Sequence, residues 1–401
     1  MRAQGLVALT PVPRQDTRVS ALMTAALIGT LSVGAGPLGP FFPEWPADLQ
    51  HDVVKEAKAF AGEFAFIVKD VESGATYTYN GSTPMYLASG IKIPVLIALF
   101  QLIREKKATL SEEMTYTRND VRDGSPLLSY LRPGTPMSLR VLAEAMIQRS
   151  DNAATDMVIK RVGIKRVNEA LGREGLTPFG PITTLIDVRR LVYRRVNPRS
   201  ASLTPVDIFT LGMTRGLDAR MALFSDYVRS TTSYSKVDYA AAFRAYYRQG
   251  YNSAPLTSMV ELLDALAQGK VISAAHSAEM VDIMAGTQTG LDRLRSGLPP
   301  DIRFAHKTGT QFRRMCDFGI VFMPDGRPVV MVVATKGGRG RSHSEALMAR
   351  LARRAYWHLA TPVERERLRK LARMQFGGPF DEDEADPEDL RSLSERRRKR
   401  R

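Results

Sequence analysis

The chain has 401 residues and a formal net charge of +15, from 57 lysine and arginine residues against 42 aspartate and glutamate residues. Hydrophobic residues make up 44% of it, which allows an ordinary buried core and excludes a wholly disordered protein. The basic residues are scattered or gathered at the extreme C-terminus, so we expect no nucleic-acid partner. The single cysteine, Cys316, excludes an internal disulfide, and no Cys/His group has metal-ligand spacing. We therefore expect no metal and no cofactor.

The first 36 residues have the features of an export signal. Arg14 and Arg18 precede an apolar run from Val19 to Gly36 that ends in small residues. This pattern is typical of a signal peptide, and an uncleaved membrane anchor is the alternative. The Thr and Ser residues within the run argue against a stable membrane span, which needs about 20 predominantly apolar residues. We expect an exported protein, periplasmic or extracellular, whose leader is removed or retained as an anchor.

The next segment, residues 45–88, predicts one helix and two strands. Apolar residues recur with helical spacing over residues 48–64. Residues 65–81 form two β-rich runs separated by Glu72, Ser73 and Gly74, which is typical of a hairpin.

Residues 89–300 predict a helical subdomain, because apolar residues recur there mainly with helical spacing. Loops at 177–181 and 197–200 interrupt this pattern. We expect an inserted region at about residues 185–250 within it.

Strand patterns return at 303–305, 317–322 and 328–335, followed by a helix from His343 to Leu359. Residues 301–360 would therefore complete the sheet that 45–88 begins. The expected fold is α/β (α+β): an antiparallel sheet flanked by helices, plus the helical subdomain.

Residues 361–401 combine an acidic block with the basic run 396–401 and have little apolar content. A solvated, disordered tail is the expectation. The basic run could instead contact anionic lipid or a cell-wall polymer, so membrane or cell-wall association is a second expectation.

Three short motifs carry the chemistry: Ser-Gly-Ile-Lys at 89–92, Ser-Asp-Asn at 150–152 and Lys-Thr-Gly at 307–309. A Ser-x-x-Lys match alone occurs by chance about once in such a chain, but the ordered triple is far more specific. A three-residue step places Ser89 and Lys92 on one helix face. A lysine with a lowered pKa there could take the serine proton. Read singly, the first two motifs could instead be helix caps.

Together the motifs resemble the signature of class A β-lactamases and penicillin-binding proteins, over about residues 45–360. The resemblance implies a β-lactamase/transpeptidase-like fold with Ser89 as nucleophile and Lys92 as its base. It implies that Ser150 relays a proton to the leaving nitrogen. Asn152 would bind the substrate amide, and Asp151 would hold the loop together.

For the third motif, the resemblance implies that Lys307 faces the serines and that the edge strand pairs with the substrate backbone. Gly309 would permit the close approach between strand and substrate. An oxyanion hole would form from the backbone N–H groups of Ser89 and Thr310. The remaining substrate-binding residue of this strand would be Thr308.

The chain departs from the class A pattern in two places. It has no glutamate between Glu174 and Glu261, where the family carries the acid that positions the deacylating water. Depending on the alignment, Asp238 or Asp187 falls near that position, and either could be an ordinary surface aspartate. The arginine that many class A enzymes present to the substrate carboxylate is also missing from the strand after Lys-Thr-Gly. Arg313 or Arg314 could take its place, or either could be a solvated loop residue.

We therefore predict a monomeric serine hydrolase that forms an acyl-enzyme on a β-lactam or a D-alanyl peptide amide of peptidoglycan type. The alternative is a deacylation-deficient penicillin-binding or cell-wall-binding protein. A non-catalytic binding module is the competing hypothesis from another class.

Overall fold

The computed structural model describes residues 44–125 and 127–376. Two predictions, the leader at 1–36 and the basic run at 396–401, lie outside these residues. Within the described part, no helix combines the length and apolar character that a membrane span requires.

The core of the fold is a five-stranded antiparallel sheet in the order β2-β1-β9-β8-β7. The predicted hairpin forms its first two strands, and the three late strand patterns form the others. Strand β9 pairs along the whole of β1, so the sheet joins segments separated by more than half the chain. The strands are β1 Gly62–Asp70, β2 Thr76–Tyr79, β7 Phe304–Gln311, β8 Arg314–Phe322 and β9 Pro328–Gly337.

Both faces of the sheet are buried, because successive side chains of a strand point to opposite faces. On β1, Phe66 and Val68 belong to one apolar cluster, whereas Ala65 and Ile67 belong to another. The strand therefore reads as a continuous apolar run, as the sequence shows.

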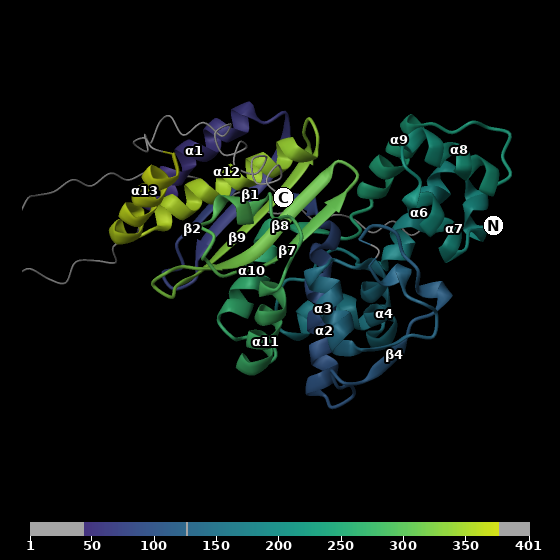
Figure 1. The fold of residues 1–401 in the computed structure, drawn as a ribbon, viewed down its shortest axis with the longest axis horizontal. Helices are drawn as coiled ribbons and strands as arrows, with labels where there is room; N and C mark the ends of the chain where they lie inside the picture. The colour runs from purple at the N-terminus through teal and green to yellow at the C-terminus, as the bar shows by residue number, and fades with distance from the viewer. Residues whose placement is uncertain (1–43, 126, 377–401) are drawn as a thin grey trace, which may run out of the picture. The chain divides into compact units, whose positions relative to one another are not determined.

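Helices from the two ends of the described chain cover one face of the sheet: α1 Trp45–Ala59 and α12 Arg341–Leu359 (Figure 1). Charged side chains also pair between the two helices. Arg350 Nη2 lies 2.7 Å from the Glu56 carboxylate, and His358 Nε2 lies 2.8 Å from Asp52.

The chain departs from the expected solvated tail just after residue 361. Helix α13, Pro362–Phe376, continues the fold beyond α12. Leu368 packs on the apolar cluster beneath α12, and the hydroxyl of Tyr356 donates to Glu364 at 2.8 Å. The many charges of this segment indicated a solvated tail. In the fold some of its arginines pair with acidic residues, as Arg367 does with Asp301, so the segment can pack.

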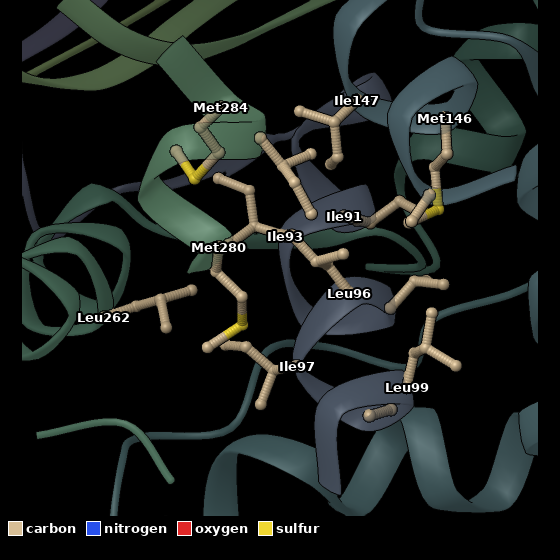
Figure 2. Packing of buried hydrophobic residues seen from close by; sticks show 14 of the residues in the cluster. Ile91, Ile93, Leu96, Ile97, Leu99, Met146, Ile147, Leu262, Met280 and Met284 are labelled. Atoms are coloured by element: carbon tan, nitrogen blue, oxygen red, sulfur yellow. The ribbon is translucent and has the colours of Figure 1, made fainter. Parts of the chain in front are cut away.

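The helical subdomain surrounds α2, Lys92–Arg104, in which eleven consecutive residues from Lys92 to Leu102 are buried. A helix that is apolar on all sides must lie inside a protein. Figure 2 shows Ile93, Leu96 and Ile97 of α2 among side chains of α3, α10 and α11. The surrounding helices are α3 Leu139–Gln148, α4 Asn152–Val162, α5 Ile164–Arg173, α10 Leu256–Ala267 and α11 Ala274–Ala285.

Residues 185–247, within the region predicted as an insertion and called the insertion below, form four α-helices with an apolar cluster rich in tyrosine and phenylalanine. This cluster includes Tyr86 and Ala88, which directly precede Ser89, and it packs against Phe312 at the end of β7. The insertion therefore borders the segments that carry the first and third motifs. Its helices are α6 Leu185–Val196, α7 Pro205–Met213, α8 Leu217–Tyr227 and α9 Lys236–Tyr247.

Candidate active site

Ser89 lies in a short 3₁₀ turn, Ala88–Ile91, that leads directly into α2. The preceding residue, Ala88, has φ of 46°, a left-handed conformation that a residue with a side chain rarely adopts. Such strain is characteristic of functional sites. Ser89 itself is half-buried, and within the described residues its hydroxyl makes no hydrogen bond to another side chain.

Lys92, one turn further on, is fully buried and joins the first motif to the second. Its ammonium donates to the Ser150 carbonyl at 2.6 Å and to Asn152 Oδ1 at 2.9 Å. It also lies 3.3 Å from the Ser150 hydroxyl. Burial, and next the positive charge of Lys307, hold the pKa of Lys92 well below its ordinary value. The Lys92 amine, with its lowered pKa, therefore lies beside the candidate proton relay Ser150.

The second motif is shaped by Asp151, which is completely buried and caps α4. One carboxylate oxygen accepts from the Ala154 amide at 2.7 Å and the other from the Leu128 amide at 2.9 Å. Ser150 has φ of 58°, so the chain turns sharply just before the cap. The expectation that Asp151 holds this loop together agrees with these contacts, while Asn152 Nδ2 reaches the Asp123 carbonyl at 2.6 Å.

The third motif lies on β7, the edge strand of the sheet. Lys307 is fully buried, and its ammonium donates to the Thr308 carbonyl at 2.9 Å. Burial lowers the pKa of Lys307 to about 7, with a further lowering from the charge of Arg293. Because Lys307 in turn lowers the pKa of Lys92, the first and third motifs lie within electrostatic reach. The fold thus brings all three motifs together.

Gly309 allows β7 to approach the turn that carries Ser89. A Cβ atom at this position would lie 2.7 Å from the Leu87 carbonyl oxygen and 2.9 Å from Ala88 Cβ. No side chain fits there without displacing backbone. The Ser89 turn and Thr310, the proposed sources of the oxyanion hole, are therefore held against one another through Gly309.

Arg293 is a site residue that the sequence did not reveal. Its side chain is 2% exposed, and it donates to the Thr310 hydroxyl at 2.6 Å and to the Gly309 carbonyl at 3.0 Å. Glu345 of α12 lies 3.4 Å from it. It stands in an irregular segment with no motif around it, so only the tertiary contacts reveal it.

Within the described part of the chain, neither of the two arginines that follow the third motif forms a side-chain hydrogen bond or ion pair with a residue of the motifs. Arg313 is exposed in the turn between β7 and β8. Arg314 stacks on the ring of Tyr247 from the insertion, 4.6 Å from its centroid. Arg293, in contrast, contacts the strand of the third motif at Gly309 and Thr310.

Among the described residues, neither candidate deacylation acid forms a hydrogen bond or ion pair with a residue of the three motifs. Asp238 is exposed and caps α9, where hydrogen bonds from Ser235 lower its carboxyl pKa. Asp187 lies in the first turn of α6, whose N-cap is Thr184, and its carboxylate accepts from the Thr184 hydroxyl at 2.5 Å. The reason is local: both aspartates stand three residues after a Ser or Thr N-cap, and the capping interaction decides their direction.

The buried carboxylates of Asp156 and Asp151, within and directly before α4, are already engaged. Asp156 of α4 accepts from Arg122 at 2.6 Å and from the amides of Leu185 and Ile186. Asp151 serves as the α4 cap. Among the described residues, no hydrogen bond or ion pair of Ser89, Lys92 or Ser150 involves a carboxylate side chain.

The chain thus has a mixed α/β fold in which the edge strand β7 packs against the turn that carries Ser89, and the buried Lys92 contacts Ser150. Residues 48–359 match the model of the β-lactamase enzyme family, and the chain belongs to that family, with class A β-lactamases as relatives. The predictions of family and fold are thereby confirmed.

The relatives are distant. The carbapenem-hydrolysing β-lactamase KPC of Klebsiella oxytoca is 27% identical over 305 residues, covering 74% of this chain and 84% of that protein. The β-lactamase SME-1 of Serratia marcescens is 23% identical over 305 residues, covering 75% and 85%. Among solved structures, PBP-A matches with a TM-score of 0.59 at 22% identity, covering 78% of this chain and 96% of that one.

Proposed function

We propose that the protein is a serine hydrolase that forms an acyl-enzyme through Ser89 on a β-lactam or a related D-alanyl peptide amide. The observation that carries this proposal is the position of Lys92. Its amine is fully buried, contacts Ser150 and Asn152, and lies within the field of a second buried lysine. A lysine whose pKa is lowered by burial and a neighbouring positive charge can accept the proton of a serine hydroxyl.

In the proposed acylation, one bond forms at the substrate carbonyl carbon and one C–N bond breaks. Ser89 Oγ forms a bond to the carbonyl carbon while its proton passes to Lys92. The oxyanion is met by the backbone N–H groups of Ser89 and Thr310. The C–N bond then breaks, the nitrogen takes a proton through Ser150, and an ester remains on Ser89. Water must attack that ester to release the product.

Substrate binding is assigned to the third motif and to Asn152. Thr308 and Thr310 offer hydroxyl groups, Arg293 places positive charge behind Thr310, and Lys307 adds its charge when it is protonated. A β-lactam or a peptide ending in D-alanine carries a carboxylate, which such donors would bind. Two relatives support this substrate class: KPC is described as carbapenem-hydrolysing, and a PBP-A variant was solved as an acyl-enzyme complex with penicillin G.

We further propose that deacylation is slow. A water molecule needs a base to attack the ester, and the carboxylates beside the site are committed to caps and to Arg122. This favours a penicillin-binding protein with weak turnover over an efficient β-lactamase.

The test follows hydrolysis and intact mass together, with a chromogenic cephalosporin and with penicillin G. We expect one penicillin equivalent to attach to the protein and to persist for many minutes. Ser89→Ala must abolish the adduct. A non-catalytic binding module would still retain the ligand in Ser89→Ala, and rapid turnover without an adduct would contradict slow deacylation.

Export remains part of the proposal. It is supported by Arg14, Arg18 and the apolar run that follows them. Sequencing the N-terminus of the protein recovered from cells distinguishes a cleaved leader from a retained anchor. Recovery of the complete chain from the cytoplasm would refute export.

A further inference from the structure

A series of hydrogen bonds and one ion pair connects four residues at one end of the candidate active site. Asn152 Nδ2 donates to the Asp123 carbonyl at 2.6 Å. The carboxylate of Asp123 accepts from Arg189 Nε at 2.9 Å and pairs with Arg189 Nη2 at 2.8 Å. Arg189 Nη1 then donates to Gln311 Oε1 at 3.2 Å. The four residues, which we call the Arg189 bridge, link the second motif to the last residue of β7.

The insertion contributes Arg189 to the bridge, because this residue lies on α6. The Arg189 and Asp123 side chains are 14% and 8% exposed, so both are largely withdrawn from water. Helix α7 packs on Asp123 so closely that a Cβ atom on Gly212 would lie 2.2 Å from Asp123 Cβ. The ion pair is therefore held in place by the helices of the insertion.

A second contact fixes the insertion to the far side of the site. The hydroxyl of Tyr247, at the end of α9, donates to the Phe312 carbonyl at 2.8 Å. Phe312 directly follows Gln311, so the end of β7 is held from both α6 and α9. Gly124 leaves room at the junction, since a Cβ atom there would lie 3.2 Å from Asn152 Nδ2 and 3.9 Å from Arg189 Nη2.

The location of the bridge determines which part of a substrate it would contact. In the proposed function the substrate amide lies between Asn152 and β7. The group attached beyond that amide then extends toward the Arg189 bridge. We propose that the Arg189 bridge closes this end of the substrate groove and limits the size of the acyl side group that the protein accepts.

The alternative is an ion pair that only supports the fold. Removing one partner of a buried ion pair destabilises a protein because it leaves an unpaired charge. The distinguishing variant is Gln311→Ala, which opens the outer end of the bridge and leaves the pair of Arg189 with Asp123 intact. Arg189→Ala is the second variant, and Arg190→Ala is the matched control, because Arg190 is the exposed next residue of α6.

The experiment measures the second-order rate constants of acylation of the whole protein by penicillin G and by piperacillin, whose acyl side group is much bulkier. Intact mass reports the adduct. In Gln311→Ala and Arg189→Ala, we expect the ratio of the piperacillin to the penicillin G rate constant to rise at least about tenfold. In Arg190→Ala we expect the ratio of the unaltered protein.

This inference rests on the proposed function, and the two fail differently. An unchanged ratio in a Gln311→Ala protein that still forms the adduct overturns the Arg189 bridge alone. If Arg189→Ala does not fold, the Gln311→Ala ratio decides. If the unaltered protein forms no adduct with either penicillin, the proposed function and this inference fall together.

Discussion

At the scale of single residues, Lys307 shows how burial couples chemistry to stability. Its pKa in the folded protein is about 7, against an ordinary value of 10.5. Between these pH values the unfolded chain binds a proton that the folded protein has released. The free energy of unfolding therefore rises with pH in this window, by about 1.4 kcal/mol for each pKa unit of difference.

We predict that Lys307→Met flattens this dependence, because the side chain no longer titrates. The measurement is urea unfolding at several pH values from 7 to 10 for both proteins. The difference between the two curves isolates Lys307 from the tyrosines that titrate at the upper end. Parallel curves would show that Lys307 keeps an ordinary pKa in the folded protein.

Two aspartate caps provide a second comparison at this scale. Asp151 is buried and accepts from two backbone amides, whereas Asp238 is exposed on α9. Asp151→Ala leaves buried donors unsatisfied, so it should cost about 2–4 kcal/mol of unfolding free energy. Asp238→Ala should cost about 1 kcal/mol.

The same pair tests the chemistry. We expect the lifetime of the acyl-enzyme to be unchanged in Asp238→Ala, because this carboxylate serves α9. Intact-mass decay of the penicillin G adduct measures it. A markedly longer lifetime would return Asp238 to the role of deacylation acid.

At the scale of elements, the contact between β7 and the Ser89 turn depends on a missing side chain. Gly309→Ala would push against Leu87, Ala88 and Cys316 Sγ, which lies 2.6 Å from the added Cβ position. We expect a loss of about 1–3 kcal/mol in unfolding free energy and slower acylation. Chemical unfolding and the acylation rate constant measure the two effects.

Gly172 of α5 is the matched control for this substitution. Its φ is not positive, and the nearest atom to an added Cβ is Pro178 Cγ at 3.9 Å. Gly172→Ala should stabilise the helix by up to about 1 kcal/mol, because glycine has the greater freedom in the unfolded chain. Equal effects at both positions would mean that the close approach at Gly309 is relieved without cost.

At the scale of the whole molecule, helices from opposite ends of the described chain cover one face of the sheet, so α1 should unfold together with the active site. Leu49 of α1 is fully buried, whereas Val54 on the same helix is 37% exposed. Leu49→Ala should cost about 2–5 kcal/mol, and Val54→Ala less than about 1 kcal/mol.

Cooperativity is the observable. In Leu49→Ala the loss of secondary structure, followed by circular dichroism, and the loss of adduct formation should occur at the same, lower urea concentration. If adduct formation survived the loss of α1, the helix would be an independent unit.

The sequence by itself determined much of the fold. Period-two and helical patterns predicted the hairpin at 65–81, the three late strands and the helix from 343, because these patterns depend on neighbours along the chain. It also determined the motif residues and their order, and from these the family. It did not predict α13, whose charges are neutralised by partners elsewhere in the fold.

Only the tertiary structure decided which other residues join the site. Arg293 approaches Thr310 from an irregular segment, and Arg189 reaches Gln311 across 122 positions of sequence. The carboxylates of Asp187 and Asp238 instead accept hydrogen bonds from the N-cap residues Thr184 and Ser235 of their own helices. The physical reason is that helix caps and periodic apolar faces depend on residues close together in the sequence. The burial and charge that lower the pKa values of Lys92 and Lys307 come from segments that meet only when the chain has folded.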